Sequence, residues 1–403
     1  MMDANKTDAA ADTTPEHVVD LVRSRERIDE IDKKIVELFC ERMDVVKDVA
    51  VYKAATGKAV FDAERERQKI ERATAQADAK YGEFVAPLFT MLMELSRSYQ
   101  DRQLHPQSEL SRFVSSIPRK GAFPQKARVA CQGALGSWAY SATKRMVPGA
   151  DIDFEDTWEG VCDKVAAGEA DFGVMPLENT TTGTVTRAWD LLHAKGLYVV
   201  RSVNLRIDQC LLAKPGTKLE DIREVFSHEQ GLRQCASYLE SLDAGIRRSI
   251  RENTASAARA VAQSERTDVA AIASADCAEL YGLEVLVPSI QDMKENLTRF
   301  ACFAKSPVVY DEADRTSLLL ITPHEPGSLF RVISRFAALG INMVKLESRP
   351  IPGREFEFMF YLDVESTPKD EVFMKAAAQI PYISEQLHFL GSYADVSQES
   401  EGR

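Results

Sequence analysis

The stretch DFGVMPLENTTTGTV, from Asp171 to Val185, places a short apolar run directly before a run of small polar residues. This order predicts a strand whose end carries hydroxyl and amide side chains. Three further stretches place small polar residues at a strand end in the same way: GALGSWAYSA (Gly133 to Ala142), SHEQGLRQC (Ser227 to Cys235) and ENLTRF (Glu295 to Phe300). Between them, short apolar runs alternate with helical stretches, which is typical of an α/β domain with room for two lobes.

The chain on either side of this region follows different patterns. Residues 19–104 are helical in pattern, with Gly57, Gly82 and Pro87 as their only glycines and proline, and predict three helices. The last part alternates as strand, helix, strand, strand, helix, strand, which is a ferredoxin-like order. We therefore expect a disordered lead (1–18), an all-α bundle (19–104), a linker rich in Pro, Ser and Gly (105–126), a two-lobed α/β domain (127–307) and an α+β ferredoxin-like domain (314–396).

One strand of the C-terminal domain alternates clearly. Phe356, Phe358 and Phe360 fall on one face and Glu357 on the other, with Asp363 further along on that same polar face. We therefore expect one face of this sheet to be covered.

The composition limits the partners. The 403 residues carry a formal net charge of −12, which disfavours nucleic acid and anionic membranes and favours small molecules. The seven cysteines are scattered and never spaced C-x-x-C, which argues against disulfides and a zinc site. The polar N-terminus does not have the pattern of a signal peptide, so we expect a cytoplasmic protein. We also expect no metal and no cofactor.

Cations interrupt an apolar stripe in the helical region. Arg42 and Lys53 share the stripe of Ile28, Ile35 and Val49 and, at eleven residues apart, point the same way. The third helix carries Ser96 and Gln100 after Phe89 and Met93, and Asp62 and Glu66 lie at i, i+4 in the second helix. Taken singly, Arg42 could pair with Glu66, Asp62 could be an N-cap and Lys53 could extend to solvent; taken together, inward polar residues in a bundle indicate a site.

This region resembles the all-helical class of chorismate mutases, in LVRSRERIDEIDKKIVELFCER, DAERER and the final S-x-x-x-Q. The resemblance implies an intertwined dimer in which Arg42 and the partner chain's Arg25 bind the two substrate carboxylates. It assigns Lys53 and Gln100 to the ether oxygen, and Asp62, Arg65, Glu66 and Ser96 to the substrate hydroxyl, the carboxylates and one another. Arg97 departs from the family, which more often has an aliphatic residue at this position.

The four polar stretches together resemble prephenate dehydratases, which fold as two lobes around a cleft, similar to type II periplasmic binding proteins. The resemblance makes Thr298 the principal catalytic residue, acting as a hydrogen-bond or proton donor to the leaving hydroxyl. His228 is the alternative acid, although its neighbours suit a helix start, and Glu178 could instead simply tie one lobe to the other. The other residues implied are Glu178, Asn179, Thr180, Ser227 and Gln230 along the cleft, with Arg299 supporting it.

The C-terminal stretches PHEPGSL (Pro323 to Leu329) and KLESRP (Lys345 to Pro350) resemble the ACT regulatory domains of prephenate dehydratases. The first opens a helix whose free N–H groups could hold a carboxylate. The resemblance implies phenylalanine bound between two such domains, and Ser328 replaces the usual Ala. The implied residues are Gly327, Ser328, Leu329, Glu347, Ser348, Arg349 and Pro350.

The sequence therefore predicts an enzyme that converts chorismate to prephenate and prephenate to phenylpyruvate in phenylalanine biosynthesis, with feedback inhibition by phenylalanine. A homodimer or homotetramer is expected. Two alternatives remain: a prephenate decarboxylase-type enzyme, and a non-catalytic amino-acid sensor.

Overall fold

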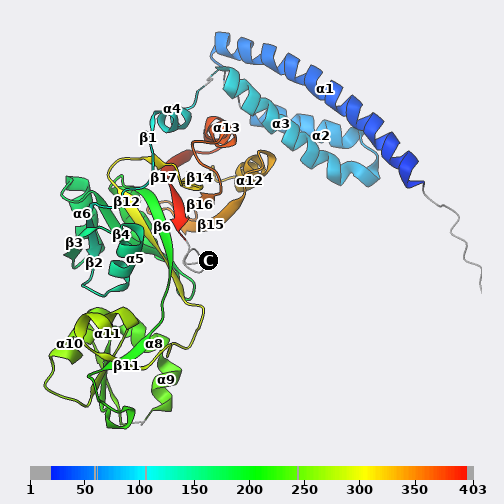
Figure 1. Ribbon diagram of the computed structural model, residues 1–403. Helices are drawn as coiled ribbons and strands as arrows, with labels where there is room; N and C mark the ends of the chain where they lie inside the picture. Colours follow the sequence, from blue (N-terminus) through cyan, green and yellow to red (C-terminus); the bar gives the residue numbers. More distant parts are fainter. Residues whose placement is uncertain (1–19, 59, 61, 105–106, 243–244, 397–403) are drawn as a thin grey trace, which may run out of the picture. The chain divides into compact units, whose positions relative to one another are not determined.

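The computed structural model describes residues 20–58, 60, 62–104, 107–242 and 245–396 (Figure 1). The chain forms two compact units, residues 1–106 and 107–403. The expected disordered lead, residues 1–18, lies outside the described residues.

The first unit is helical, as predicted. Helix α1 begins after Asp20, whose carboxylate accepts hydrogen bonds from the N–H groups of Val22 and Arg23, and it ends at Gly57 in the left-handed conformation, φ 67°. Helix α3 packs against both α1 and α2. The elements are α1 (Leu21–Thr56), α2 (Ala63–Gln76), the 3₁₀ turn η1 (Ala79–Tyr81) and α3 (Gly82–Leu104).

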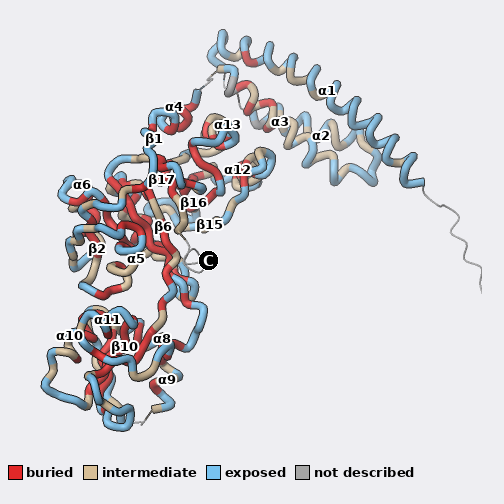
Figure 2. Tube along the Cα trace, viewed as in Figure 1, coloured by how far each residue is buried: buried red, intermediate tan, exposed pale blue. Residues whose placement is uncertain are grey.

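The apolar stripe of α1 is exposed within one chain, contrary to its expected place in a core. Ala50 is the only buried residue of this helix, and most of α1 is coloured as exposed in Figure 2. Ile28 and Ile35 are 55% and 57% exposed. At 36 residues, α1 is far longer than the 23-residue α3 that packs against it and than the 14-residue α2. Large exposed apolar faces of this kind are typical of interaction surfaces.

The segment expected to be a linker is folded from residue 107 onward. Helix α4 (Glu109–Ser116) buries Leu110 and Val114 against α13 (Glu371–Gln379), and the Ser108 hydroxyl donates to the Ala377 carbonyl at 2.7 Å. Strand β1 (Arg119–Lys120) pairs with β13 (Val309–Tyr310). Leu110 and Val114, four residues apart, give α4 an apolar side that packs on α13 despite the Pro, Ser and Gly residues around it. This segment therefore belongs to the second unit.

The central part has two lobes, each built on its own sheet. The second lobe's five-stranded sheet has the order β11-β7-β10-β8-β9, and the chain enters it after β6 and leaves it before β12. The first lobe contains β2 (Arg128–Gln132), α5 (Trp138–Met146), β3 (Asp151–Glu155), α6 (Trp158–Ala167), β4 (Phe172–Asn179), β5 (Gly183–Thr184), α7 (Thr186–Ala194), β6 (Tyr198–Arg206) and β12 (Leu297–Ala304). The second contains β7 (Cys210–Ala213), η2 (Leu219–Asp221), β8 (Glu224–Ser227), α8 (Glu229–Gln234), α9 (Ala236–Ser241), β9 (Arg247–Ile250), α10 (Thr254–Gln263), β10 (Val269–Ala273), α11 (Ala275–Tyr281) and β11 (Glu284–Val287).

The C-terminal elements follow the expected order strand, helix, strand, strand, helix, strand. Strand β17 pairs in parallel with β6, so one ten-stranded sheet runs from the C-terminal elements into the first lobe. The face that carries Tyr361 and Asp363 is also covered: the two residues are 2% and 1% exposed, because this face packs against the first lobe. The elements are β14 (Arg315–Ile321), α12 (Ser328–Ala338), β15 (Met343–Pro350), β16 (Phe358–Val364), α13, η3 (Ile380–Tyr382) and β17 (Gln386–Val396).

Candidate active sites

Arg42 lies between α1 and α3 with neutral partners. Its guanidinium donates to the Ser96 hydroxyl and to the Leu92 carbonyl at 3.3 Å, and it lies 3.6 Å from the Met93 sulfur. Burial lowers the pKa of Arg42. Among the described residues no carboxylate pairs with it, so this half-buried cation is arranged to receive an anion.

Lys53 lies on α1, as Arg42 does, and Gln100 lies on α3, as Ser96 does. The Lys53 ammonium donates to the Val60 carbonyl at 2.5 Å, again a neutral partner. Gln100 donates to the Ser96 carbonyl at 3.2 Å, and its own amide oxygen is buried without a partner among the described residues. The structure thus gathers Arg42, Ser96 and Gln100 on one side of α3.

Asp62, Arg65 and Glu66 open α2, as expected. The Asp62 carboxylate accepts from the Arg65 N–H at 3.1 Å, so Asp62 is the N-cap. Glu66 does not pair with Arg42; its carboxylate is 2.8 Å from a guanidinium nitrogen of Arg97. Arg97 was singled out by the sequence only as a departure, and it faces the site, with its side chain 16% exposed.

Arg25 is exposed near the start of α1, seventeen residues before Arg42. At 1.5 Å of rise per residue the two lie about 25 Å apart, so Arg25 cannot reach the Arg42 site of its own chain.

In the first lobe, Asn179 holds Thr298. Its amide nitrogen donates to the Thr298 hydroxyl at 2.9 Å, to the Asn296 side chain at 2.6 Å and to the Leu297 carbonyl at 3.2 Å. The two residues are close because β12 pairs with β4 in a register that places Thr298 opposite Asn179. Since Thr298 accepts this hydrogen bond, its own O–H hydrogen is available to donate elsewhere.

The threonines after Asn179 form a loop held by the same residue. The side-chain amide oxygen of Asn179, Oδ1, accepts from the N–H groups of Thr181 and Thr182 at 2.9 and 3.1 Å. The Thr180 hydroxyl donates to the Glu295 carbonyl at 3.0 Å and accepts from the Leu297 N–H at 2.9 Å. Thr180 therefore fastens the loop to the start of β12.

Glu178 and Arg299 also lie opposite each other, but they face the C-terminal elements. Arg299 is 3.2 Å from the Glu178 carboxylate and donates to Asp363 at 2.8 Å. Although burial opposes its charge, Tyr393 and Asp363 raise the pKa of Arg299 above its ordinary value. Glu178 also pairs with Lys345 of β15, a residue that the sequence did not single out. In the structure Glu178 therefore joins the first lobe to the C-terminal elements and not to the second lobe, and its place along the cleft stays a prediction.

The second-lobe residues do not contact Thr298. The Ser227 hydroxyl is fully buried and donates to the Ile272 carbonyl at 2.8 Å. Gln230 is exposed in the first turn of α8, and its N–H donates to the His228 ring at 3.2 Å. His228 is the N-cap of α8, which agrees with the helix-start interpretation.

A cavity of about 310 Å³ lies at the start of α12. Gly327, Ser328 and Leu329 line it together with Phe358 and Phe360, and Gly327 takes the left-handed conformation at φ 83°.

The other predicted effector residues lie on β15 and, at two positions, turn away from this cavity toward the first lobe. Glu347 accepts from the Thr184 hydroxyl, and Arg349 pairs with Asp190. The alternate residues Ser348 and Pro350 are exposed. One chain therefore does not bring the two halves of the expected effector site together.

Two family matches cover most of the chain. Residues 24–101 match the family chorismate mutase type II, and residues 129–308 match prephenate dehydratase. The bifunctional chorismate mutase/prephenate dehydratase of Escherichia coli (strain K12) is 32% identical over 384 residues, which are 93% of this chain and 96% of that protein. The chain belongs to the bifunctional chorismate mutase/prephenate dehydratase family.

Solved structures resemble the dehydratase part of this family member. A prephenate dehydratase from Arthrobacter aurescens in complex with L-Phe is 27% identical, with a TM-score of 0.59, and covers 66% of this chain and 89% of that chain. A structure described as a novel type of quorum quenching acylase is 30% identical with a TM-score of 0.59, covering 66% of this chain and 98% of that chain. None of the helices in the described ranges combines the length and hydrophobicity needed to cross a membrane.

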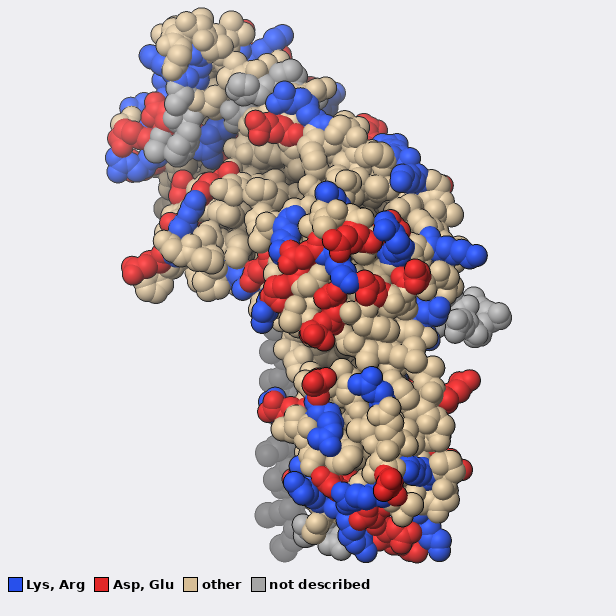
Figure 3. All heavy atoms as spheres, turned by 90° about the vertical axis from the view of Figure 1, so that its left-hand side faces the viewer, with Lys and Arg blue, Asp and Glu red and all other residues tan. Residues whose placement is uncertain are grey.

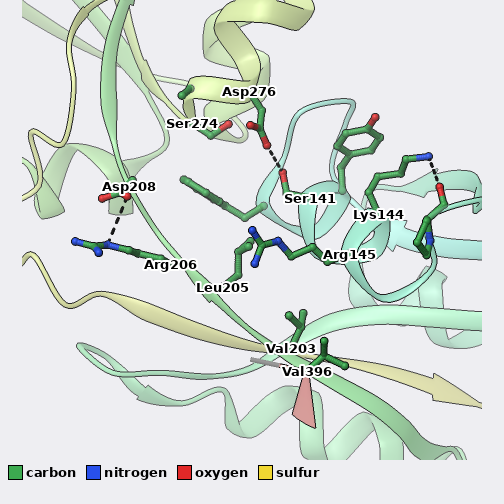
Figure 4. Close-up of a pocket in the computed structure, with 14 residues that line it drawn as sticks. Ser141, Lys144, Arg145, Val203, Leu205, Arg206, Asp208, Ser274, Asp276 and Val396 are labelled. Carbon is green, nitrogen blue, oxygen red and sulfur yellow. Dashed lines mark hydrogen bonds and ion pairs between the residues drawn. The ribbon is translucent and has the colours of Figure 1, made fainter. Parts of the chain in front are cut away.

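The dehydratase part also has a pocket that the sequence did not indicate. It measures about 700 Å³ and lies where α5 of the first lobe meets α11 of the second, bridged by the Ser141 hydroxyl donating to Asp276 at 2.9 Å (Figure 4). Leu205 lines it and is the strand neighbour of Thr298. The pocket is lined by three cations, Lys144, Arg145 and Arg206. Lys144 and Arg145 are adjacent in the sequence, in the last turn of α5, whereas Arg206 comes from the end of β6.

Basic and acidic side chains are interspersed over the face shown in Figure 3. On that face the described residues form no broad patch of one sign.

Proposed function

We propose that the helical unit rearranges chorismate to prephenate at the site around Arg42, and that Thr298 drives the loss of carbon dioxide and hydroxide from prephenate. Chorismate is a dicarboxylate whose rearrangement is unimolecular, so the site needs shape and charge and no acid, base or cofactor. The observation that carries the proposal is the pair of inward cations, Arg42 and Lys53, whose partners are neutral.

In this proposal Arg42 binds one substrate carboxylate with its planar guanidinium, and the partner chain's Arg25 binds the other. Lys53 and Gln100 donate to the ether oxygen, where negative charge grows as the carbon–oxygen bond breaks. The exposed apolar stripe of α1 supports the dimer that this arrangement requires. Asp62, Arg65, Glu66 and Ser96 orient the substrate and the two main cations.

For the second reaction, aromatisation supplies the driving force and the enzyme must help hydroxide leave. The hydrogen bond from Asn179 supports Thr298 as that donor, because it fixes the hydroxyl oxygen and leaves the hydrogen free. Thr180 shapes the loop beside it. Ser227 and Gln230 contribute when the second lobe closes on the substrate, and Arg299 acts indirectly by holding Glu178.

The C-terminal elements are, in this proposal, an ACT domain that binds phenylalanine and inhibits the dehydratase. The cavity at Gly327 supports it, together with the L-Phe complex of the Arthrobacter aurescens relative. The exposed side of β15 supports a second copy completing the site, in a homodimer or homotetramer. The contact between Lys345 and Glu178 supports a direct path from this domain to the strand pair that carries Thr298.

Purified protein supplied with chorismate tests the proposal. Prephenate should appear first and aromatic phenylpyruvate should follow, in the absence of added cofactor. A non-aromatic product in place of phenylpyruvate would favour the decarboxylase alternative, and unchanged chorismate would favour the sensor. A cytoplasmic location remains a prediction.

A further inference from the structure

Arg97 and Glu66 form a closely packed ion pair inside the helical unit. The distance from the Arg97 Nη1 to the Glu66 Oε2 is 2.8 Å, and the two side chains are only 16% and 19% exposed. On α3, Arg97 precedes Gln100 by three residues, so the two side chains are neighbours on the helix surface. A surface ion pair would be far more solvated than this one.

Glu66 lies in a partly buried place with several charges around it. Burial raises its pKa, while the charge and the hydrogen bond of Arg97 act in the opposite direction, followed by the charge of Lys53. Asp62 adds a like charge that opposes ionisation. The charged groups around Glu66 are Lys53 from α1, Arg97 from α3, and Asp62 and Lys69 from α2 itself. Arg42 and Arg65 act on Lys69, and Glu94 lies 4.0 Å from Arg97.

We propose that Arg97 is a positioning residue of the mutase reaction, which holds Glu66 as an oriented, charged acceptor for the substrate hydroxyl. The inference rests on the proposed function, in which Glu66 contacts that hydroxyl. An ionised carboxylate accepts a shorter and stronger hydrogen bond than a neutral group does. The guanidinium occupies one carboxylate oxygen, Oε2, and so leaves Oε1 to accept from the substrate.

A purely structural tie between α2 and α3 is the competing explanation, and it makes a different prediction. Loss of a tie lowers activity by the same factor at every pH and regardless of the residue at position 66. Loss of a positioning cation acts through the protonation of Glu66. Without Arg97 the pKa of Glu66 rises further. As the pH falls, Glu66 is then protonated at a higher pH, and the activity that needs its charged form is lost at that higher pH.

The test uses the full chain and measures mutase kcat/KM between about pH 5 and pH 9, with dehydratase activity on added prephenate as the folding control. Arg97→Met removes the charge and keeps much of the length, and Arg97→Lys keeps the charge. We expect Arg97→Met to lower kcat/KM by about ten- to a hundred-fold at neutral pH, the usual effect of a lost charge-assisted hydrogen bond. Its acid limb should move to higher pH, and Arg97→Lys should restore the position of that limb.

The same substitution in a Glu66→Gln background completes the cycle. Glutamine cannot ionise, so Arg97→Met should then change kcat/KM by no more than about two- to threefold. An unshifted acid limb, or an undiminished effect beside Glu66→Gln, would overturn the proposal and leave a structural tie. If Arg97→Met does not fold, Arg97→Gln is measured in the same cycle. Failure of the underlying site assignment looks different, because Lys53→Ala would then still convert chorismate at the wild-type rate.

Discussion

Replacement of Thr298 by valine removes one hydroxyl and little else. Thr298 is 7% exposed, and valine keeps the branched shape that β12 accommodates. The Asn179 amide nitrogen loses its contact with Thr298 but keeps Asn296 at 2.6 Å and the Leu297 carbonyl at 3.2 Å. Because no buried donor is left without a partner, the free energy of unfolding should fall by only about 1 kcal/mol.

The effect on chemistry should be far larger. Loss of one preorganised donor at a site of developing charge typically costs about 10²–10³ in rate. Thr298→Val should therefore accumulate prephenate from chorismate, with phenylpyruvate formation reduced by about that factor. The assay follows both products from chorismate, and it uses circular dichroism and retained mutase activity as controls. Phenylpyruvate formation at the wild-type rate would refute the reasoning and transfer the donor role to His228 or a water molecule.

Three further predictions follow from the same structure. Lys53→Ala should lower mutase activity by at least about 10²–10³ while dehydratase activity on added prephenate stays near wild type, and near wild-type conversion of chorismate would contradict the site. Gly327→Val puts a branched side chain at a backbone φ of 83°, so it should weaken phenylalanine binding in titration calorimetry while both activities persist; unchanged binding would move the effector site elsewhere. Lys345→Met should retain dehydratase activity but weaken its inhibition by phenylalanine, because it breaks the contact between β15 and Glu178; unchanged inhibition would mean that the coupling runs through other contacts.

The sequence predicted elements better than it predicted their surroundings. Helical periodicity was sufficient for the three helices of the first unit, and the apolar run before Asn179 was sufficient for β4. Helical periodicity could not show that the stripe of Ile28 and Ile35 lies exposed in one chain, because it indicates an apolar face and not what covers that face.

The contacts between distant residues were the least predictable. The pair of Asn179 and Thr298 depends on the register of β4 and β12, 119 residues apart in sequence. The ties from Arg299 to Asp363 and from Glu178 to Lys345 depend on the way the C-terminal sheet continues the first lobe through β17 and β6. No local pattern carries that information.

The most direct test of two separate sites in one chain mixes two inactive variants. Lys53→Ala and Thr298→Val are each supplied with chorismate, alone and together, and phenylpyruvate is measured. The account predicts little product from either variant alone and restored product from the mixture, because prephenate released by Thr298→Val reaches the intact dehydratase of Lys53→Ala. Full product from either variant alone, or none from a mixture of two folded variants that each retain the other activity, would contradict it.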